Sequence, residues 1–126
     1  MEKKQIQTSQ APSAIGPYSQ AIRIGEFLYT SGQIALNPQN MEMMNSDIEE
    51  ETEWVLKNVE AILKADGLSL AHVIKTTVYL TDLGEFARMN QVYEKFFAET
   101  KPARACVQVA ALPKGAKVEI DAIAAD

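Results

Sequence analysis

The chain has 126 residues, of which 47% are hydrophobic and 23% charged, and these values are ordinary for a single folded domain spanning residues 1–126. Twelve Lys and Arg against seventeen Asp and Glu give a net charge of -5, which disfavours a nucleic-acid partner because affinity for a phosphate backbone comes from clustered cations. One cysteine and one histidine can form neither an internal disulfide nor a Cys/His zinc site, and with no secretory signal or long apolar run we expect a cytoplasmic protein with no membrane partner.

The first third of the chain predicts short strands separated by loops. Residues 4–7 favour a short edge strand and lead into residues 11–17, where two prolines and a glycine favour a shaped loop. Residues 19–24 and 27–31 are strand-forming, and the Gly-Glu pair between them predicts a tight hairpin. Residues 32–46 are typical of a long irregular connection.

Two later segments have the apolar spacing of amphipathic helices. The first opens on a sequence typical of a capping box, with Ser46 as the N-cap and Glu49 returning the hydrogen bond. Its apolar positions continue at helical spacing to Gly67, which favours a left-handed end. The acidic residues of segment 82–85 repeat the capping pattern, and the helix that follows must end before Pro102.

Three further segments predict strands, at residues 73–80, 103–109 and 117–124. The resulting order is β-β-β-α-β-α-β-β. We therefore expect an α+β fold in which two helices pack on one face of a mixed sheet. The other face would then meet solvent or a neighbouring subunit.

Alternation along the last two strands groups their polar residues. In segment 103–109, Arg104, Cys106 and Gln108 share a face, opposite an apolar set. In segment 117–124, Glu119 lies opposite another apolar set. Because the helices would cover the apolar sets, we expect Arg104 and Glu119 to lie together on the face away from the helices.

This pair has two interpretations. It is either a solvated cross-strand ion pair with little effect on stability, or part of a substrate site at a subunit seam. The second is favoured by apolar residues expected on the same outer face, namely Val73, Tyr79, Cys106 and Ile123, because an exposed apolar patch marks association. In such a seam a guanidinium binds a substrate carboxylate through two hydrogen bonds, and a carboxylate orients or deprotonates water.

Other candidate residues carry weaker signals. Cys106 is better explained as a small apolar residue than as a nucleophile. A nucleophilic cysteine needs a base to activate it, and the chain offers only one histidine for that role. That histidine, His72, fits a surface or capping position, and Ser31-Gly32 fits a turn better than a phosphate cradle. Tyr18 is either a core aromatic or a ring that closes a pocket.

Several blocks of sequence, in order along nearly the whole chain, resemble the RidA (YjgF) family. They are Ala14-Ile15-Gly16-Pro17-Tyr18-Ser19-Gln20-Ala21, Ser31-Gly32-Gln33-Ile34, Val78-Tyr79-Leu80-Thr81-Asp82-Leu83, Asn90-Gln91-Val92-Tyr93, Lys101 through Val109, Leu112-Pro113-Lys114 and Val118-Glu119-Ile120. The block from Lys101 to Val109 is the most specific of them.

The resemblance implies a chorismate-mutase-like α+β fold and a homotrimer with sites in the clefts between subunits. It also implies cofactor-free hydrolysis of reactive enamines and imines, such as 2-iminobutanoate and 2-iminopropanoate, to 2-oxo acids and ammonia. These substrates are released by PLP-dependent dehydratases, which would be an indirect functional partner.

The resemblance also implies roles for individual residues. Arg104 corresponds to the arginine that binds the substrate carboxylate, and Glu119 to the acidic residue near the attacking water. Cys106 corresponds to a position that contributes backbone contacts. Positions that shape or hydrogen-bond the ligand correspond to Tyr18, Ser31, Gly32 and Asn90.

Two alternatives stay open. A non-catalytic trimer could bind small carboxylates in the same cleft and report to a partner protein. A ribonuclease or translation inhibitor is the other, although the acidic balance and the lack of a basic, aromatic stripe count against it.

Overall fold

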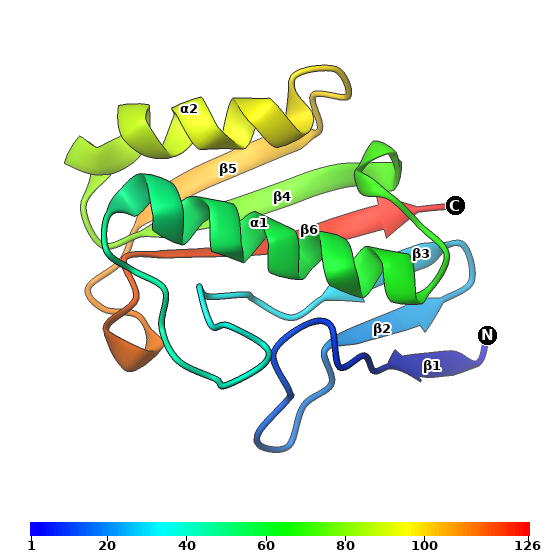
Figure 1. Cartoon of the computed structure of the whole chain (residues 1–126). Helices are drawn as coiled ribbons and strands as arrows, with labels where there is room; N and C mark the ends of the chain where they lie inside the picture. The colour runs from blue at the N-terminus through cyan, green and yellow to red at the C-terminus, as the bar shows by residue number, and fades with distance from the viewer.

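Two helices lie on one face of a six-stranded sheet in the computed structural model, which describes residues 1–126 (Figure 1). The predicted α+β element order is confirmed. The elements are β1 (Lys3–Ile6), β2 (Ala21–Ile24), β3 (Phe27–Thr30), α1 (Ile48–Ala65), β4 (Val73–Leu80), α2 (Phe86–Phe97), β5 (Ala103–Gln108) and β6 (Val118–Ala125), with short 3-10 turns at Leu70–His72, Leu83–Glu85 and Pro113–Gly115.

The sheet has the strand order β1-β2-β3-β6-β4-β5. The pairing of β4 with β5 is parallel and the other pairings are antiparallel, so the sheet is mixed as predicted. A parallel pair needs a crossover connection, and α2 supplies it. The predicted hairpin joins β2 to β3, and Gly25 in its turn has a φ of 57°, which glycine adopts readily.

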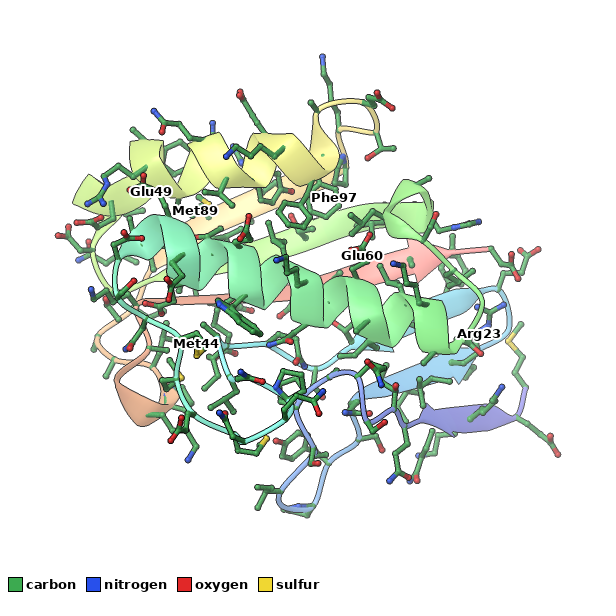
Figure 2. The ribbon with its side chains drawn as sticks, viewed as in Figure 1. Arg23, Met44, Glu49, Glu60, Met89 and Phe97 are labelled. Carbon is green, nitrogen blue, oxygen red and sulfur yellow. The ribbon has the colours of Figure 1, made fainter.

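The core lies between the helices and the sheet. Alternate residues of β6 are buried beneath the helices, beginning with Val118 and Ile120. Met89 and Phe97 of α2 are buried from the other side and are labelled in Figure 2. Neither helix combines the length and apolar character that crossing a lipid bilayer requires.

The N-terminal cap of α1 differs from the expected one. The side chain of Asp47, not Ser46, accepts a hydrogen bond from the backbone N–H of Glu50 at 2.8 Å. Glu49 forms an ion pair with Arg88 of α2 instead of returning a capping bond. The predicted capping box is therefore wrong. Ser and Asp stand side by side and both are good caps, so the pattern could not fix the helix start to one residue.

The other helix boundaries follow local signals. Gly67 has a φ of 75° and donates to the carbonyl of Lys64 at 3.0 Å, which is the left-handed end predicted for α1. Asp82 caps the short 3-10 turn through the N–H of Gly84 at 2.8 Å, and α2 begins only at Phe86. His72 accepts from the backbone N–H of Ser69 at 3.0 Å, which confirms it as a capping residue.

The reassigned cap gives a stability prediction. Asp47→Ala should lower the free energy of unfolding by about 1 kcal/mol, because it leaves a helix N–H without its acceptor. Ser46→Ala, one residue away, should change it by less than about 0.5 kcal/mol. Urea unfolding at fixed protein concentration measures both, and a larger effect at position 46 would identify Ser46 as the N-cap.

Candidate active site

A cavity of about 490 Å³ lies where β3 ends beside β6. Four residues singled out in the sequence line it: Tyr18, Ser31, Gly32 and Glu119. The sequence blocks around these residues are far apart in the chain, so the fold brings them together. Apolar side chains, Lys114 and the polar residues Ser13, Gln20 and Gln33 complete the wall.

The cavity forms because the chain leaves the sheet for two residues after β3. Thr30 still contacts β6, since its hydroxyl accepts from the N–H of Ala122 at 3.0 Å. Pairing resumes at Gln33, which exchanges two backbone hydrogen bonds with Ile120 at 2.9 and 3.1 Å. Ser31 and Gly32 lie in the gap between these contacts, facing Glu119 on β6.

Gly32 fits directly against the carboxyl group of Glu119. A Cβ atom at position 32 would overlap a carboxylate oxygen of Glu119 and lie 2.9 Å from its Cδ. The glycine is therefore required for close approach of backbone and carboxylate, which is a reason for glycine at binding sites. The adjacent Ser31 is fixed by its own hydroxyl, which donates to the carbonyl of Ser19 at 2.5 Å.

The loop that carries Tyr18 is held by a residue that the sequence analysis did not single out. The buried side chain of Gln20 accepts from the N–H of Thr8 at 2.7 Å and donates to the carbonyl of Pro12 at 2.7 Å. Gln20 lies within one of the family-like blocks, and this position was the feature of the sequence that could have indicated its role. Its side chain ties the loop to the end of the cavity.

Glu119 is half-buried, and burial raises the pKa of its carboxyl group. The negative charge of Asp121, two residues along the same face of β6, raises this pKa further. A carboxyl group with a raised pKa exchanges protons closer to neutral pH than an exposed glutamate does, which suits acid–base chemistry. No three His, Cys, Asp or Glu side chains are close enough to hold a metal ion together.

Arg104 lies in a different place. Its Nη1 donates to Oδ1 of Asn90 on α2 at 2.7 Å. Its guanidinium stacks over the rings of Tyr93 and Phe86, with centroids at 4.7 and 5.3 Å. Arg104, Asn90 and Tyr93 border a second cavity of about 600 Å³, together with Lys101. The fold therefore brings Asn90 and Arg104 together. The guanidinium of Arg104 is an exposed cation that packs on aromatic rings.

The expectation that Arg104 and Glu119 share a face is wrong. Arg104 is in register with Thr76 of β4, whose hydroxyl bonds to that of Tyr93 on α2, so both point toward the helices. Glu119 is in register with Tyr79, which lies on the opposite face. The two site residues of one chain are therefore separated by the sheet.

Alternation grouped the residues of β5 correctly but assigned the groups to the wrong faces. Arg104, Cys106 and Gln108 do share a face, and it is the face toward α2 and the turn before it. Ala103 and Ala105 face outward on this edge strand. The planar guanidinium of Arg104 packs against the aromatic rings of α2, so a charged residue can occupy a position on the helix-facing side of β5 where we expected an apolar one.

The outer face of the sheet is partly apolar, although with a different membership from the expected one. Tyr29 and Val107 are 45% and 43% exposed there, and Tyr79 and Ile123 are half-buried. Val73 is buried beneath the helices instead, contrary to the prediction.

Cys106 packs half-buried against the core and not on the outer face where it was expected. Burial raises the pKa of its thiol, and the charge of Arg104 opposes this with a smaller effect. These features match the interpretation of Cys106 as a small apolar residue, because a thiol with a raised pKa is a poor nucleophile at neutral pH.

Among the residues of the Glu119 cavity that were not predicted as site residues, Lys114 and Met41 have positive φ angles. Lys114 lines it from the turn before β6 with a φ of 57°, and Met41 lines it from the loop after β3 with a φ of 61°. Lys114 belongs to a family-like block, whereas no signal in the sequence indicated that Met41 would reach the cavity.

Comparison with known proteins places the chain in a family. Residues 8–126 match the family model described as Endoribonuclease L-PSP, and the chain belongs to this family. Solved structures of Rid and YjgF proteins match nearly the whole chain, which confirms the resemblance to RidA (YjgF).

Individual relatives cover almost the full length. The chain is 53% identical to Protein DfrA of Myxococcus xanthus over 98% of this chain and 96% of that protein. It is 47% identical to mouse 2-iminobutanoate/2-iminopropanoate deaminase over 97% of this chain and 90% of the mouse protein. The crystal structure of Escherichia coli TdcF with bound serine matches with a TM-score of 0.94 and 49% identity, covering 98% of each chain.

The electrostatics of the cavity give a prediction. Asp121→Asn should lower the pKa of Glu119 toward its ordinary value, because it removes a negative charge that disfavours ionisation of the glutamate. The change is followed by NMR titration of the Glu119 side-chain carboxyl carbon. Glu99→Gln, on an exposed turn after α2, makes the same change in net charge and should leave the titration unaltered. Equal shifts in both variants would contradict the local effect.

Proposed function

We propose that the protein hydrolyses reactive 2-imino acids and their enamine forms to 2-oxo acids and ammonia, without a cofactor. The proposed substrates are 2-iminobutanoate and 2-iminopropanoate, released in the cytoplasm by PLP-dependent dehydratases. The observation that carries this proposal is the carboxyl group of Glu119, which faces an open cavity and has a raised pKa. The name of the mouse relative supports the same activity.

The reaction asks for a positioned water and one proton acceptor. An imine with a protonated nitrogen is electrophilic at its carbon. Water adds there to form a C–O bond while Glu119 takes one of its protons, giving a carbinolamine. Glu119 then returns its proton to the nitrogen, and the C–N bond breaks as the hydroxyl group loses its proton to Glu119 and becomes the carbonyl of the 2-oxo acid, so ammonia leaves. Gly32 and Ser31 border the position in which this water would sit.

The substrate carboxylate needs a cation, and Arg104 is the proposed one. Its guanidinium makes one hydrogen bond within the chain, to Asn90, and has no ion pair with any carboxylate of the chain. An exposed, planar guanidinium with spare donors is suited to bind a carboxylate through two hydrogen bonds.

Since the sheet separates Arg104 from Glu119, we propose that each site combines the two residues from different copies. Arg104 and Asn90 of one copy would face the Glu119 cavity of the next in a homotrimer. The exposed apolar residues of the outer sheet face, among them Tyr29 and Val107, support association because apolar surface of this kind favours burial. A head-to-tail contact repeated around a ring joins two different surfaces in this way.

RNA cleavage is a second candidate, favoured by the description of the family model. The net charge of -5 counts against it, because affinity for a phosphate backbone comes from clustered cations. A carboxylate-binding trimer without catalysis would also use Arg104. Ammonia release above the spontaneous rate, with the imine generated by a dehydratase, supports the deaminase, whereas RNA cleavage that persists through repurification supports the nuclease.

Loss of the guanidinium should abolish most of the activity. Arg104→Ala should lower kcat/KM for 2-iminobutanoate by about 10²-fold or more, because it removes two charge-assisted hydrogen bonds to the substrate. Arg88→Ala, which removes an exposed arginine of α2 paired with Glu49, is the matched control and should retain activity. Sedimentation checks that both variants assemble like the wild type. Turnover at the wild-type rate in Arg104→Ala would remove Arg104 from the site.

Mixing two inactive variants tests the shared site. Arg104→Ala and Glu119→Gln should each be inactive alone. After unfolding and refolding together in equal amounts, about a quarter of the sites should combine an intact Arg104 with an intact Glu119, so activity should return to about that fraction. If both residues acted from one chain, every mixed site would lack one of them and no activity would return.

A further inference from the structure

Glu51 of α1 is a fully buried glutamate outside the candidate site. Its side chain is 0% exposed, whereas carboxylates are almost never fully buried without partners. One oxygen, Oε2, accepts from the backbone N–H groups of Lys117 and Val118 at 2.6 and 3.1 Å. The other oxygen, Oε1, is buried without a hydrogen-bond partner. Burying a carboxyl group with an unpaired oxygen costs free energy of folding. Its two hydrogen bonds show that it holds the backbone at Lys117 and Val118.

These contacts fix the start of β6, directly before Glu119. Toward β3, the pairing of β6 reaches only as far as Ile120, which bonds to Gln33. The N–H groups of Lys117 and Val118 therefore lack a strand on that side, and Glu51 supplies the acceptor. On the other side, the carbonyl of Lys117 accepts from Thr81 at 3.1 Å.

The carboxyl group of Glu119 lies against Gly32 with no room for even a Cβ atom between them, so its fit there is sensitive to the position of the β6 backbone. A displacement of Val118 would move the next residue directly. We propose that Glu51 is a positioning residue: its carboxyl oxygen holds the backbone at Lys117 and Val118 and so fixes the carboxylate of Glu119 in its cavity. The catalytic part of this inference rests on the proposed imine hydrolysis.

Three substitutions and a control separate the hydrogen-bond contact from the presence of a carboxyl group and from general stability. Glu51→Asp keeps a carboxyl group but shortens the side chain, so that it no longer reaches both N–H groups. Glu51→Ala removes the acceptor. Glu51→Gln keeps an acceptor oxygen at the same length and should rescue the function. Thr52→Ala is the control, because it removes a buried hydrogen bond of 2.7 Å to Ile48 within the same helix, and Thr52 makes no hydrogen bond to β6.

Steady-state kinetics with 2-iminobutanoate provides the first readout. Glu51→Asp and Glu51→Ala should lower kcat by about 10- to 100-fold with KM changed less than about threefold, because misplacing one reacting group affects the chemical step. Glu51→Gln should restore kcat to within about threefold of wild type. Thr52→Ala should lose stability without losing kcat. Wild-type kcat in Glu51→Asp, or failure of Glu51→Gln to improve on Glu51→Ala, would overturn the inference.

NMR provides a second readout that does not depend on activity. In Glu51→Asp, hydrogen exchange at the Lys117 and Val118 amides should rise by about tenfold or more, and the carboxyl resonance of Glu119 should move; Thr52→Ala should leave both unchanged. Unchanged exchange and resonance in Glu51→Asp would refute the positioning role. An inactive wild-type protein would refute the proposed function alone. If Glu51→Ala does not fold, Glu51→Asp and Glu51→Gln carry the test.

Discussion

The pairing of β4 with β6 on one side and β5 on the other determines where every candidate residue points. Register places Thr76 beside Arg104 and Tyr79 beside Glu119, and successive residues of a strand project to opposite faces. No change of rotamer can overcome this, because a hydrogen-bonded sheet lies between the two side chains. One copy of the chain therefore holds two separate half-sites, one beneath α2 and one on the outer face.

Helix α1 supports both walls of the outer half-site from the opposite side of the sheet. Asn58 donates to the carbonyls of Ile34 and Leu36 at 3.1 and 2.9 Å and so holds the segment after Gly32. Glu51, seven residues earlier on the same buried side of the helix, holds the start of β6. These buried polar side chains thus hydrogen-bond to backbone groups that have no partner in a neighbouring strand. A buried polar side chain is tolerated when it is hydrogen-bonded in this way.

Local patterns in the sequence predicted the elements and the family-like blocks predicted four residues of the cavity, because turn residues, apolar spacing and such blocks are properties of short segments. They could not predict the face on which Arg104 lies. Alternation divides β5 into two sets, but small residues such as Ala103 and Ala105 suit either a core or a surface. The support for Arg104 comes from Phe86 and Tyr93, which belong to another element, so the decisive contact is tertiary. Glu51 was missed for the same reason.

Each half-site is already ordered within one chain. The Arg104 guanidinium is held by Asn90 and the ring of Tyr93, and the Glu119 carboxyl group lies directly against Gly32. Bringing two ordered surfaces together requires little loss of side-chain freedom, so more of the association free energy remains for binding. In the proposed trimer a substrate carboxylate would occupy the donors of Arg104 that no carboxylate of the chain uses. The substrate would then be oriented toward Glu119 by groups that are in position before it arrives, which is how positioning lowers a reaction barrier.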